Sequence, residues 1–384
     1  MTSSITAHSI TTDSTNCGKE IGEQIFAAFN GEQPDVVIVF ASSRHDHEKL
    51  LVAIDAACHP LSMVGCSSAG EFIARAYDEG AVSALALKST DIRFRAVVGR
   101  HLRADRTAAA RAMVNAFQGI DSTEFAYRSA LVLTDALAGH ADDFVEQLTV
   151  LTAGKYQLFG GGAGDDANFT RTHVFIGTEA VPDAAVALEM LSDKPIGVGV
   201  RHTWQPGSAA MRATAADGMR LVSVNDASPV EIFEAHAAAT SQTFDAKNPL
   251  PFFLHNVIGI ATPGGYRLRV PLAVNEDGTV QCAADVPAGA TIYIMTPSGG
   301  SALEATKTAL EQLEGNEPGV ALFFDCVATR LRMGRDFGIE LDSVRQALGS
   351  ATYAGCNTYG QIARGEGQFN GFHNCTAVVA VLPR

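Results

Sequence analysis

Gly355-Cys-Asn-Thr-Tyr-Gly-Gln361 is the stretch of sequence from which the fold can be worked out. It follows the run Ala351-Thr-Tyr-Ala354, which is typical of a short strand, and its two glycines indicate a backbone that turns sharply beside a ligand. Alone, the stretch would be an ordinary strand-loop-strand connection. A close copy, Gly65-Cys-Ser-Ser-Ala-Gly-Glu71, occurs earlier in the chain, again directly after a short apolar run. Two copies of one phrase predict a repeated structural unit.

The repeated unit is a strand with a polar end, a helix, a second strand and a Gly-rich turn. Its first strands are expected at residues 36–40, 129–133 and 319–326. Continuous apolar runs of this kind are typical of strands buried on both faces. A right-handed strand-helix-strand crossover places both strand ends at one edge of a sheet, where α/β proteins bind ligands. The sequence therefore predicts an α/β fold of mixed sheets built from pseudo-repeated βαβ units, layered with helices outside.

The composition is that of a globular protein that can bury a sizeable core. The chain has 384 residues, of which 47% are apolar and 18% are charged, and its formal net charge is −14. An acidic surface disfavours nucleic acid and anionic membranes as partners, because both require Lys and Arg for charge neutralisation. No stretch approaches the ~18 consecutive apolar residues of a membrane span, and the N-terminus lacks the basic and apolar regions of a signal peptide.

Seven cysteines, none of them in a C-x-x-C pair, argue against a disulfide framework or a zinc ribbon. With an odd number of thiols and no signal peptide, we expect a cytoplasmic protein with free cysteines. The single Trp lies in a different kind of stretch, which separates the second and third units. We place a loose division in this region and expect two domains, residues 30–225 and residues 226–384.

Several motifs resemble those of the FIST family, in the same order and in both its N-terminal and its C-terminal domain. The matching stretches are Val64-Gly-Cys-Ser-Ser-Ala-Gly-Glu71, Phe159-Gly-Gly-Gly-Ala-Gly-Asp165, Arg201-His-Thr-Trp-Gln-Pro-Gly207, Phe324-Asp-Cys326 and His373-Asn-Cys-Thr376, together with the opening stretch. They cover nearly the whole chain. The two expected domains then correspond to a FIST N-type and a FIST C-type half.

The resemblance implies a ligand-sensing module of bacterial signal transduction that binds small molecules such as amino acids. Some family members bind haem, sense nitric oxide and regulate a histidine kinase. The resemblance therefore implies either non-covalent haem b as a cofactor or an amino acid or similar molecule as the ligand, with a histidine kinase as a signalling partner. The family commonly has an acidic residue where this chain has Gln361, which implies a different ligand if that carboxylate recognises an amine.

A haem iron needs an imidazole, a thiolate or a Tyr that reaches it from a pocket. No C-x-x-C-H motif occurs, so any haem would be bound non-covalently. Of the eleven histidines we single out His202, which stands beside Trp204 at a well-matched point of the family pattern. A histidine at a strand end is more often a hydrogen-bonded structural residue, and that alternative stays open.

Polar residues of the repeated turns form the candidate ligand site. Gly-rich turns can present main-chain N–H groups to a carboxylate or phosphate, although Gly160-Gly-Gly-Ala-Gly164 is neither a P-loop nor a dinucleotide fingerprint. Glu71 and Asp165 can hold an amine, and Arg330 can pair with a carboxylate. Asn374 can instead satisfy main-chain groups in a turn, and Asp165 can cap the next segment. The other candidates are Cys66, Ser67, Ser68, Cys356, Asn357, Thr358, Tyr359 and Gln361.

Cys66 and Cys356 also support an alternative function, because a thiolate at a tight turn can be activated by aligned N–H groups. A Cys-dependent hydrolase or acyl transferase would use one of these thiols, but no histidine stands in a recognisable relation to either. Buried structural cysteines are the commoner case. We therefore expect a sensor and not an enzyme. A scaffold with an unoccupied cleft is the third class.

Overall fold

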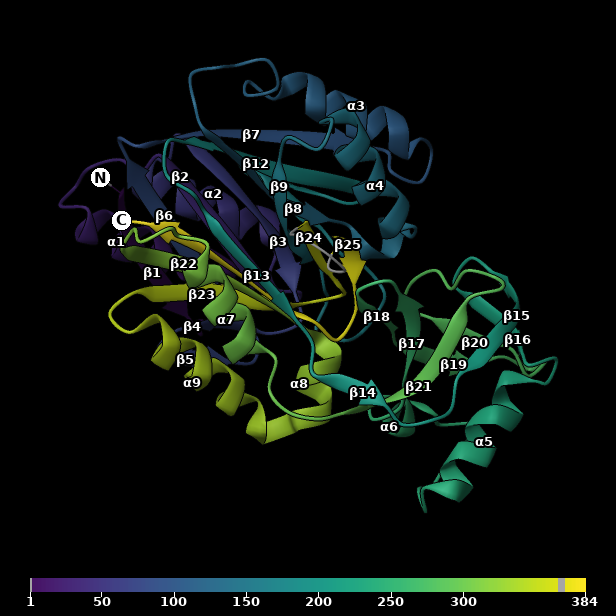
Figure 1. Cartoon of the computed structure of the whole chain (residues 1–384). Helices are drawn as coiled ribbons and strands as arrows, with labels where there is room; N and C mark the ends of the chain where they lie inside the picture. Colours follow the sequence, from purple (N-terminus) through teal and green to yellow (C-terminus); the bar gives the residue numbers. More distant parts are fainter. Residues whose placement is uncertain (1, 365–369) are drawn as a thin grey trace.

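Three six-stranded sheets form the centre of the molecule in the computed structural model, which describes residues 2–364 and 370–384 (Figure 1). All three sheets are mixed and have the same strand order, because three successive units of sequence follow the same chain path. In each unit the first and last strands pair antiparallel, and the two central strands pair parallel. The threefold repetition predicted from the sequence is therefore present in the fold.

The units are built from the following elements. The first contains β1 (Thr2–Ser9), α1 (Ser14–Ala28), β2 (Val36–Ser42), α2 (His47–Cys58), β3 (Ser62–Ser68), β4 (Glu71–Ile73), β5 (Ala76–Asp78) and β6 (Val82–Ser89). The second contains β7 (Ile92–Arg100), α3 (Arg106–Ala116), β8 (Tyr127–Thr134), η1 (Ala136–Ala138), α4 (Ala141–Leu151), β9 (Gln157–Gly162), β10 (Val174–Ile176), β11 (Glu179–Val181) and β12 (Ala184–Ser192). The third contains β13 (Gly197–Arg201), α7 (Ala302–Glu311), β22 (Pro318–Cys326), α8 (Val327–Met333), η2 (Gly334–Asp336), α9 (Phe337–Leu348), β23 (Thr352–Thr358), β24 (Gln361–Arg364), β25 (Asn370–His373) and β26 (Ala377–Pro383).

Each unit gives a two-stranded hairpin to the sheet of another unit. The hairpin β4–β5 joins β23 of the third unit, β10–β11 joins β3 of the first, and β24–β25 joins β9 of the second. Strand pairing therefore runs in a closed cycle through the three sheets, and it crosses the division predicted between residues 225 and 226. That division stays a prediction. The predicted class, mixed α/β sheets from repeated units, is confirmed.

One glycine in each unit allows the parallel strands to approach closely. A Cβ atom at any of these three positions would come within 2.0 Å of a carbonyl oxygen on the neighbouring strand. The close contacts are Gly65 with Val39, Gly160 with Val132 and Gly355 with Phe323. The glycines of the repeated phrase are therefore required by packing between strands.

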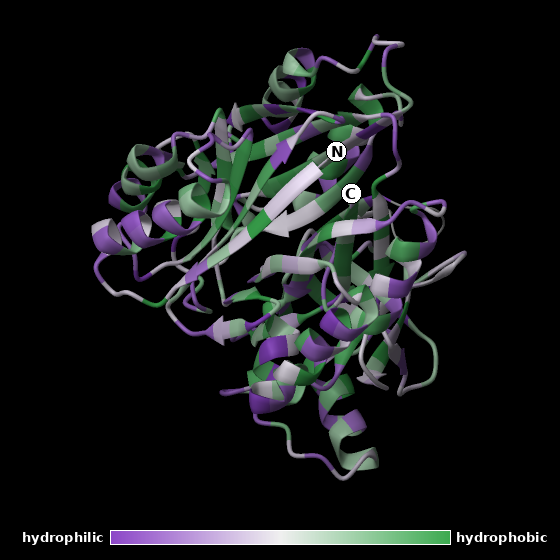
Figure 2. Ribbon diagram, turned by 90° about the vertical axis from the view of Figure 1, so that its left-hand side faces the viewer, coloured by the Kyte–Doolittle hydropathy of each residue, from purple (hydrophilic) through white to green (hydrophobic). Residues whose placement is uncertain are grey.

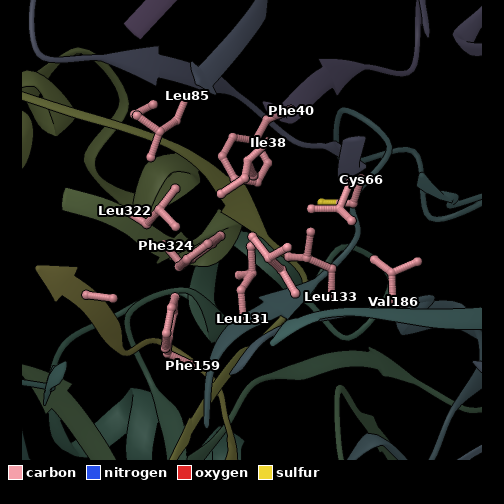
Figure 3. Packing of buried hydrophobic residues seen from close by; sticks show 14 of the residues in the cluster. Ile38, Phe40, Cys66, Leu85, Leu131, Leu133, Phe159, Val186, Leu322 and Phe324 are labelled. Atoms are coloured by element: carbon pink, nitrogen blue, oxygen red, sulfur yellow. The ribbon is translucent and has the colours of Figure 1, made fainter. Parts of the chain in front are cut away.

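The inner faces of the three sheets meet in one apolar core. Phe40 of the first sheet and Phe324 of the third pack edge to face, with ring centroids 5.6 Å apart (Figure 3). Burial of each such ring contributes about 2 kcal/mol. Helix pairs cover the outer faces: α1 with α2, α3 with α4, and α7 with α9. In Figure 2 the central strands are mostly hydrophobic, whereas the surrounding helices carry many hydrophilic residues. Within the described residues, no helix combines the length and the apolar character that a membrane crossing requires.

The third unit carries an insertion between β13 and α7 that forms a separate β domain beside the three sheets (Figure 1). Its antiparallel strands form one further sheet, and Phe233 and Phe253 pack at a centroid distance of 4.9 Å in its core. The elements are β14 (Trp204–Pro206), β15 (Met211–Asp217), β16 (Arg220–Val224), α5 (Pro229–Ala239), α6 (Leu250–Phe253), β17 (Val257–Thr262), β18 (Gly265–Arg269), β19 (Pro271–Val274), β20 (Val280–Cys282) and β21 (Thr291–Pro297).

A buried ion pair holds the inserted domain to the three-sheet core. Arg269 of β18 is 1% exposed and donates hydrogen bonds of 3.0 and 2.9 Å to the two carboxylate oxygens of Asp142 on α4. Burial lowers the pKa of Arg269, while the carboxylate of Asp142 acts in the opposite direction. Removal of Asp142 would leave the buried charge of Arg269 without its carboxylate partner.

Candidate ligand-binding site

The three Gly-rich turns meet at one rim and are hydrogen-bonded to each other through the main chain. Each turn donates an N–H group to a carbonyl oxygen of another turn, and each of these bonds is 2.9 Å long. The links run from Ala69 to Asn357, from Gly164 to Ser67 and from Tyr359 to Gly162. These N–H groups bind neighbouring turns, so they are not free to hold a ligand carboxylate.

Two predicted site residues of the turns point into the protein interior. The hydroxyl of Ser67 accepts a hydrogen bond of 2.9 Å from the N–H of His173. Asn357 is fully buried, and neither atom of its side-chain amide has a hydrogen-bond partner in the described part of the chain. Both residues belong to the packed interface between units.

Glu71 lies beside the two thiols that the sequence singled out. It is fully buried opposite Cys356 in the β4–β23 ladder, and it accepts a hydrogen bond of 2.5 Å from the hydroxyl of Ser68. Burial raises the pKa of Glu71 to about 8, so the carboxyl group is mostly protonated at pH 7. Burial and the contact with Cys66 raise the pKa of the Cys356 thiol well above its ordinary value. Both cysteines belong to the central core, and Figure 3 shows Cys66 beside Leu133.

The charged residues predicted to hold a ligand already have protein partners. Arg330 donates to the hydroxyl of Tyr77 at 2.8 Å and to the main-chain oxygen of Ala69. Asp165 accepts hydrogen bonds from the hydroxyl of Tyr359 and from three N–H groups of the following loop. Burial opposes ionisation of Asp165, but these hydrogen bonds outweigh it and lower its pKa. Both residues fix turns in place.

Gln361 connects strand ends inside the third unit. In the amide orientation that gives both its ends a partner, its nitrogen donates to the carbonyl oxygen of Thr376 at 3.1 Å. Its oxygen accepts from the hydroxyl of Thr358 at 2.9 Å and from the N–H of Cys326 at 3.2 Å. A carboxylate at this position could not make the bond to Thr376, so the amide matches its surroundings.

An apolar pocket of about 200 Å³ lies where the rim of the third unit meets the inserted domain. Helix α8 and the turns at Tyr359 and Asn374 line one side, while α6, β19 and β20 line the other. Tyr359 and Asn374 are the predicted site residues that line this pocket in the described part of the chain. None of its lining residues there is Asp, Glu, Lys, Arg or His. The apolar lining includes Phe169, Met219, Leu250, Leu254, Leu272 and Leu331.

Cys326 brings a thiol to this pocket. It ends β22 immediately before α8, lines the pocket and is 3% exposed. A hydrogen bond from the thiol of Cys375, together with main-chain N–H groups of Cys375 and Ala328, lowers the pKa of Cys326 to about 6 against the effect of burial. At pH 7 the sulfur is therefore largely thiolate, which is the nucleophilic form.

His202 lies outside the pocket lining. Its Nε2 is 2.8 Å from the main-chain oxygen of Tyr266, and burial lowers its pKa. Among the residues that the structure describes, no histidine lines the pocket and no cluster of His, Cys, Asp or Glu is arranged to hold a metal ion. A haem held by His202 does not fit this arrangement, and the prediction of haem stays untested.

Cys326 was not among the predicted site residues, although it ends the motif Phe324-Asp-Cys326. One signal could have indicated it: Cys326 occupies the polar strand end at which the other two units have Ser42 and Asp135. The opposite wall of the pocket comes from the insertion. No motif of the sequence indicated that this wall faces the rim.

A repeated α/β core and an inserted β domain have an apolar, small-molecule-sized pocket between them. Residues 35–227 match the family model of the FIST N domain, and residues 233–364 match that of the FIST C domain. The chain therefore belongs to the FIST family. FIST domains are associated with small-ligand sensing in signalling proteins, and amino acids are among the ligands that they bind.

A solved structure and the curated proteins add little to this assignment. A crystal structure of a chorismatase covers 99% of this chain and 98% of its own chain, at 10% sequence identity and a TM-score of 0.35. A likeness at this level carries no argument about function. The comparison with curated proteins finds no significant match.

Proposed function

We propose that the protein is a non-catalytic sensor that binds a small, uncharged, largely apolar molecule in the pocket between the third unit and the inserted domain. The lining of that pocket carries the proposal, because it is largely apolar and its described residues include no Asp, Glu, Lys, Arg or His. Pockets that combine apolar walls with a few polar groups are typical small-molecule sites. Asn374 and Gln281 supply such polar groups here.

The described lining residues include no Lys or Arg that could pair with a carboxylate and no Asp or Glu that could pair with an ammonium group, which favours a neutral ligand over an amino acid. A free amino acid carries a carboxylate and an ammonium group, and burial of either group without a partner is costly. Glu71, Asp165 and Arg330, which were predicted to provide such partners, do not line this pocket. An amino acid is therefore the less favoured ligand.

The position of the pocket suggests how binding could be transmitted. A ligand that touches both the α8 side and the β19–β20 side can bias the position of the inserted domain relative to the core. A second protein that recognises this position would complete the signal. A histidine kinase is the partner that the family resemblance suggests.

Burial of the candidate nucleophiles supports the non-catalytic part of the proposal. Cys66 and Cys356, on which the alternative hydrolase or acyl transferase depends, have no exposed surface. An ester or thioester substrate would have to reach them through the packed core. Loss of a measured turnover on mutation of either thiol would overturn this part of the proposal.

Haem-based sensing of nitric oxide is the second candidate. The observation that favours it is the thiol of Cys326 at the apolar pocket, because a Cys thiolate can serve as a haem ligand. Hemin should be added to the purified protein and the visible spectrum recorded before and after addition of nitric oxide. A bound Soret band that shifts would support this candidate, and a spectrum of free hemin would exclude it.

A thermal-shift screen tests the main proposal. Neutral apolar compounds should raise the melting temperature of the wild type more than amino acids do. The variant Ala328→Phe fills the pocket and should lose this response, whereas Ala238→Phe on the exposed face of α5 should keep it. Stabilisation by amino acids alone, or an unchanged response of Ala328→Phe, would contradict the proposal.

A further inference from the structure

We propose that Cys326 and Cys375 form a redox-active dithiol at the wall of the pocket, which a small organic hydroperoxide oxidises to an intramolecular disulfide. The pair would make the protein responsive to peroxide. This inference goes beyond the proposed ligand binding and does not depend on it.

The fold brings the two thiols together through neighbouring strands. Phe324 of β22 pairs with Val378 of β26 in an antiparallel ladder, so the strand ends place Cys326 next to residues 375 and 376. Both cysteines pack in one cluster with Trp204, and they are 3% and 2% exposed. The register of the strands and the shared cluster therefore place the two side chains close together.

The surroundings give the two thiols different roles. The sulfur of Cys326 accepts main-chain N–H groups of Cys375 and Ala328, which stabilise a thiolate. The hydrogen bond to Cys326, followed by burial, raises the pKa of Cys375 well above its ordinary value. Cys326 is thus the attacking thiolate, and Cys375 is the protonated partner that resolves the intermediate.

A buried acid, Asp325, lies next to the pair. Asp325 is fully buried, and its Oδ1 accepts the N–H of Cys326 at 2.6 Å. Its Oδ2 has no hydrogen-bond partner among the described residues. Burial, and after it the charges of Glu340 and Cys326, raise the pKa of Asp325 well above its ordinary value. A neutral carboxylic acid therefore stands beside the thiolate.

The oxidation proceeds in two balanced steps. The Cys326 thiolate attacks an oxygen of the hydroperoxide, an S–O bond forms while the O–O bond breaks, and the leaving alkoxide takes up a proton and departs as an alcohol. The sulfur of Cys375 then attacks the resulting sulfenic acid and gives up its proton, the S–O bond breaks, and water leaves as the S–S bond forms. The dithiol loses two electrons, and the hydroperoxide gains them.

The pocket selects the oxidant. Cys326 lines the pocket, whose other walls are apolar, so an alkyl hydroperoxide has both a route to the sulfur and a favourable environment for its alkyl group. The core thiols Cys66 and Cys356 also share one cluster, but they are fully buried and do not line this pocket. They provide an internal control within the same molecule.

Peptide mapping of the full-length protein tests the inference. The protein should be treated with tert-butyl hydroperoxide at pH 7, digested without reduction and analysed by mass spectrometry. We expect a disulfide between the Cys326 and Cys375 peptides that dithiothreitol reverses, while Cys66 and Cys356 stay reduced. Cys375→Ser should stop at a sulfenic acid on Cys326 that dimedone traps, and Cys66→Ser should behave like the wild type.

Three outcomes would overturn the inference. They are a Cys326 that stays reduced, a Cys326 that proceeds to sulfinic acid in the wild type without a disulfide, and a Cys66–Cys356 disulfide that forms equally fast. The wild-type measurement decides among these outcomes by itself, so it does not depend on the folding of any variant.

Discussion

Two pairs of cysteines each share one apolar cluster in this molecule, and they sit in different surroundings. Cys66 and Cys356 come from different sheets and are sealed in the central core. Cys326 and Cys375 come from neighbouring strands of one sheet and meet at the pocket. Each pair has a buried acid beside it, Glu71 for the first and Asp325 for the second, and the amide of Gln361 also binds the main chain of the second pair.

The comparison shows that the proximity of two thiols does not determine their reactivity. Burial and the neighbouring thiol of Cys66 raise the pKa of Cys356. Cys356 is not among the described residues that line the pocket. Hydrogen-bond donors lower the pKa of Cys326 although it is also nearly buried. The number of donors aimed at the sulfur, and access from the pocket, make the difference.

The largest expected effect concerns the close strand packing next to Cys356 in the core. Gly355 immediately precedes Cys356, and a Cβ atom there would lie 1.9 Å from the carbonyl oxygen of Phe323. Gly355→Ala should therefore reduce the free energy of unfolding by at least about 3 kcal/mol, measured by urea denaturation. Gly338→Ala within α9 meets nothing within 4 Å and should instead add about 0.5–1 kcal/mol. Equal stability of the two variants would contradict the close strand approach.

This glycine also shows how far the sequence could predict the fold. The repeated phrase at Gly65 and Gly355 indicated the repeated units, because these glycines are needed for close packing between neighbouring strands within one unit. The exchange of hairpins between units was not predictable. It depends on pairings such as Ala354 with Ile73, which join parts of the chain far apart in sequence.

The second prediction compares reactivity directly. At pH 7, iodoacetamide should modify Cys326 in the native protein at least about 100-fold faster than Cys66 or Cys356, as followed by mass spectrometry. Cys282 lines the same pocket, but burial raises the pKa of Cys282 to about 12. It should react slowly as well, which separates thiolate character from access. Rapid modification of Cys282 would mean that access alone decides reactivity.

The third prediction concerns the acid beside the core pair. The pKa of Glu71 is raised to about 8 from an ordinary value of 4.5, so the unfolded chain binds fewer protons than the folded protein between these values. The contribution of Glu71 to the free energy of unfolding is therefore most favourable below pH 4.5 and falls as the pH rises toward 8. Glu71→Gln, which copies the residue type at Gln361, should be nearly neutral at pH 5. At pH 8 and above it should stabilise the protein by about 4 kcal/mol.

Urea denaturation of both proteins across this pH range measures the effect. The difference in the free energy of unfolding between variant and wild type should grow steadily with pH. A difference that is constant with pH would show that Glu71 is ionised in the folded protein. Glu48→Gln on the exposed surface of α2 is the matched control, because it makes the same substitution outside the core.

The candidate site was less predictable than the fold, for a physical reason. The turn residues Ser67, Asn357 and Thr358 looked suited to ligand binding because small polar residues near glycines often serve that purpose. In the structure their polar groups lie in the packed interface between three units. The pocket instead forms where an insertion covers one strand end. A repeat pattern cannot show which of three equivalent rims is covered.

The smallest expected effect is a shift in a titration. The rate of alkylation of Cys326 should rise with pH around a midpoint near 6, because the thiolate is the reacting form. Cys375→Ala removes the thiol hydrogen bond, which is the largest cause of the lowered pKa, and should move the midpoint upward by about one pH unit.

The matched control for this titration is Cys66→Ala in the other thiol pair, which should leave the midpoint unchanged. The titratable groups around Cys326 are Asp325 on β22, Cys375 before β26 and Arg332 on α8. Burial, followed by the charge of Glu340, raises the pKa of Asp325. A midpoint that stays near 6 in Cys375→Ala would assign the acidity of Cys326 to the main-chain N–H groups alone. The Cys375 thiol would then contribute nothing to the difference in pKa between Cys326 and the core pair.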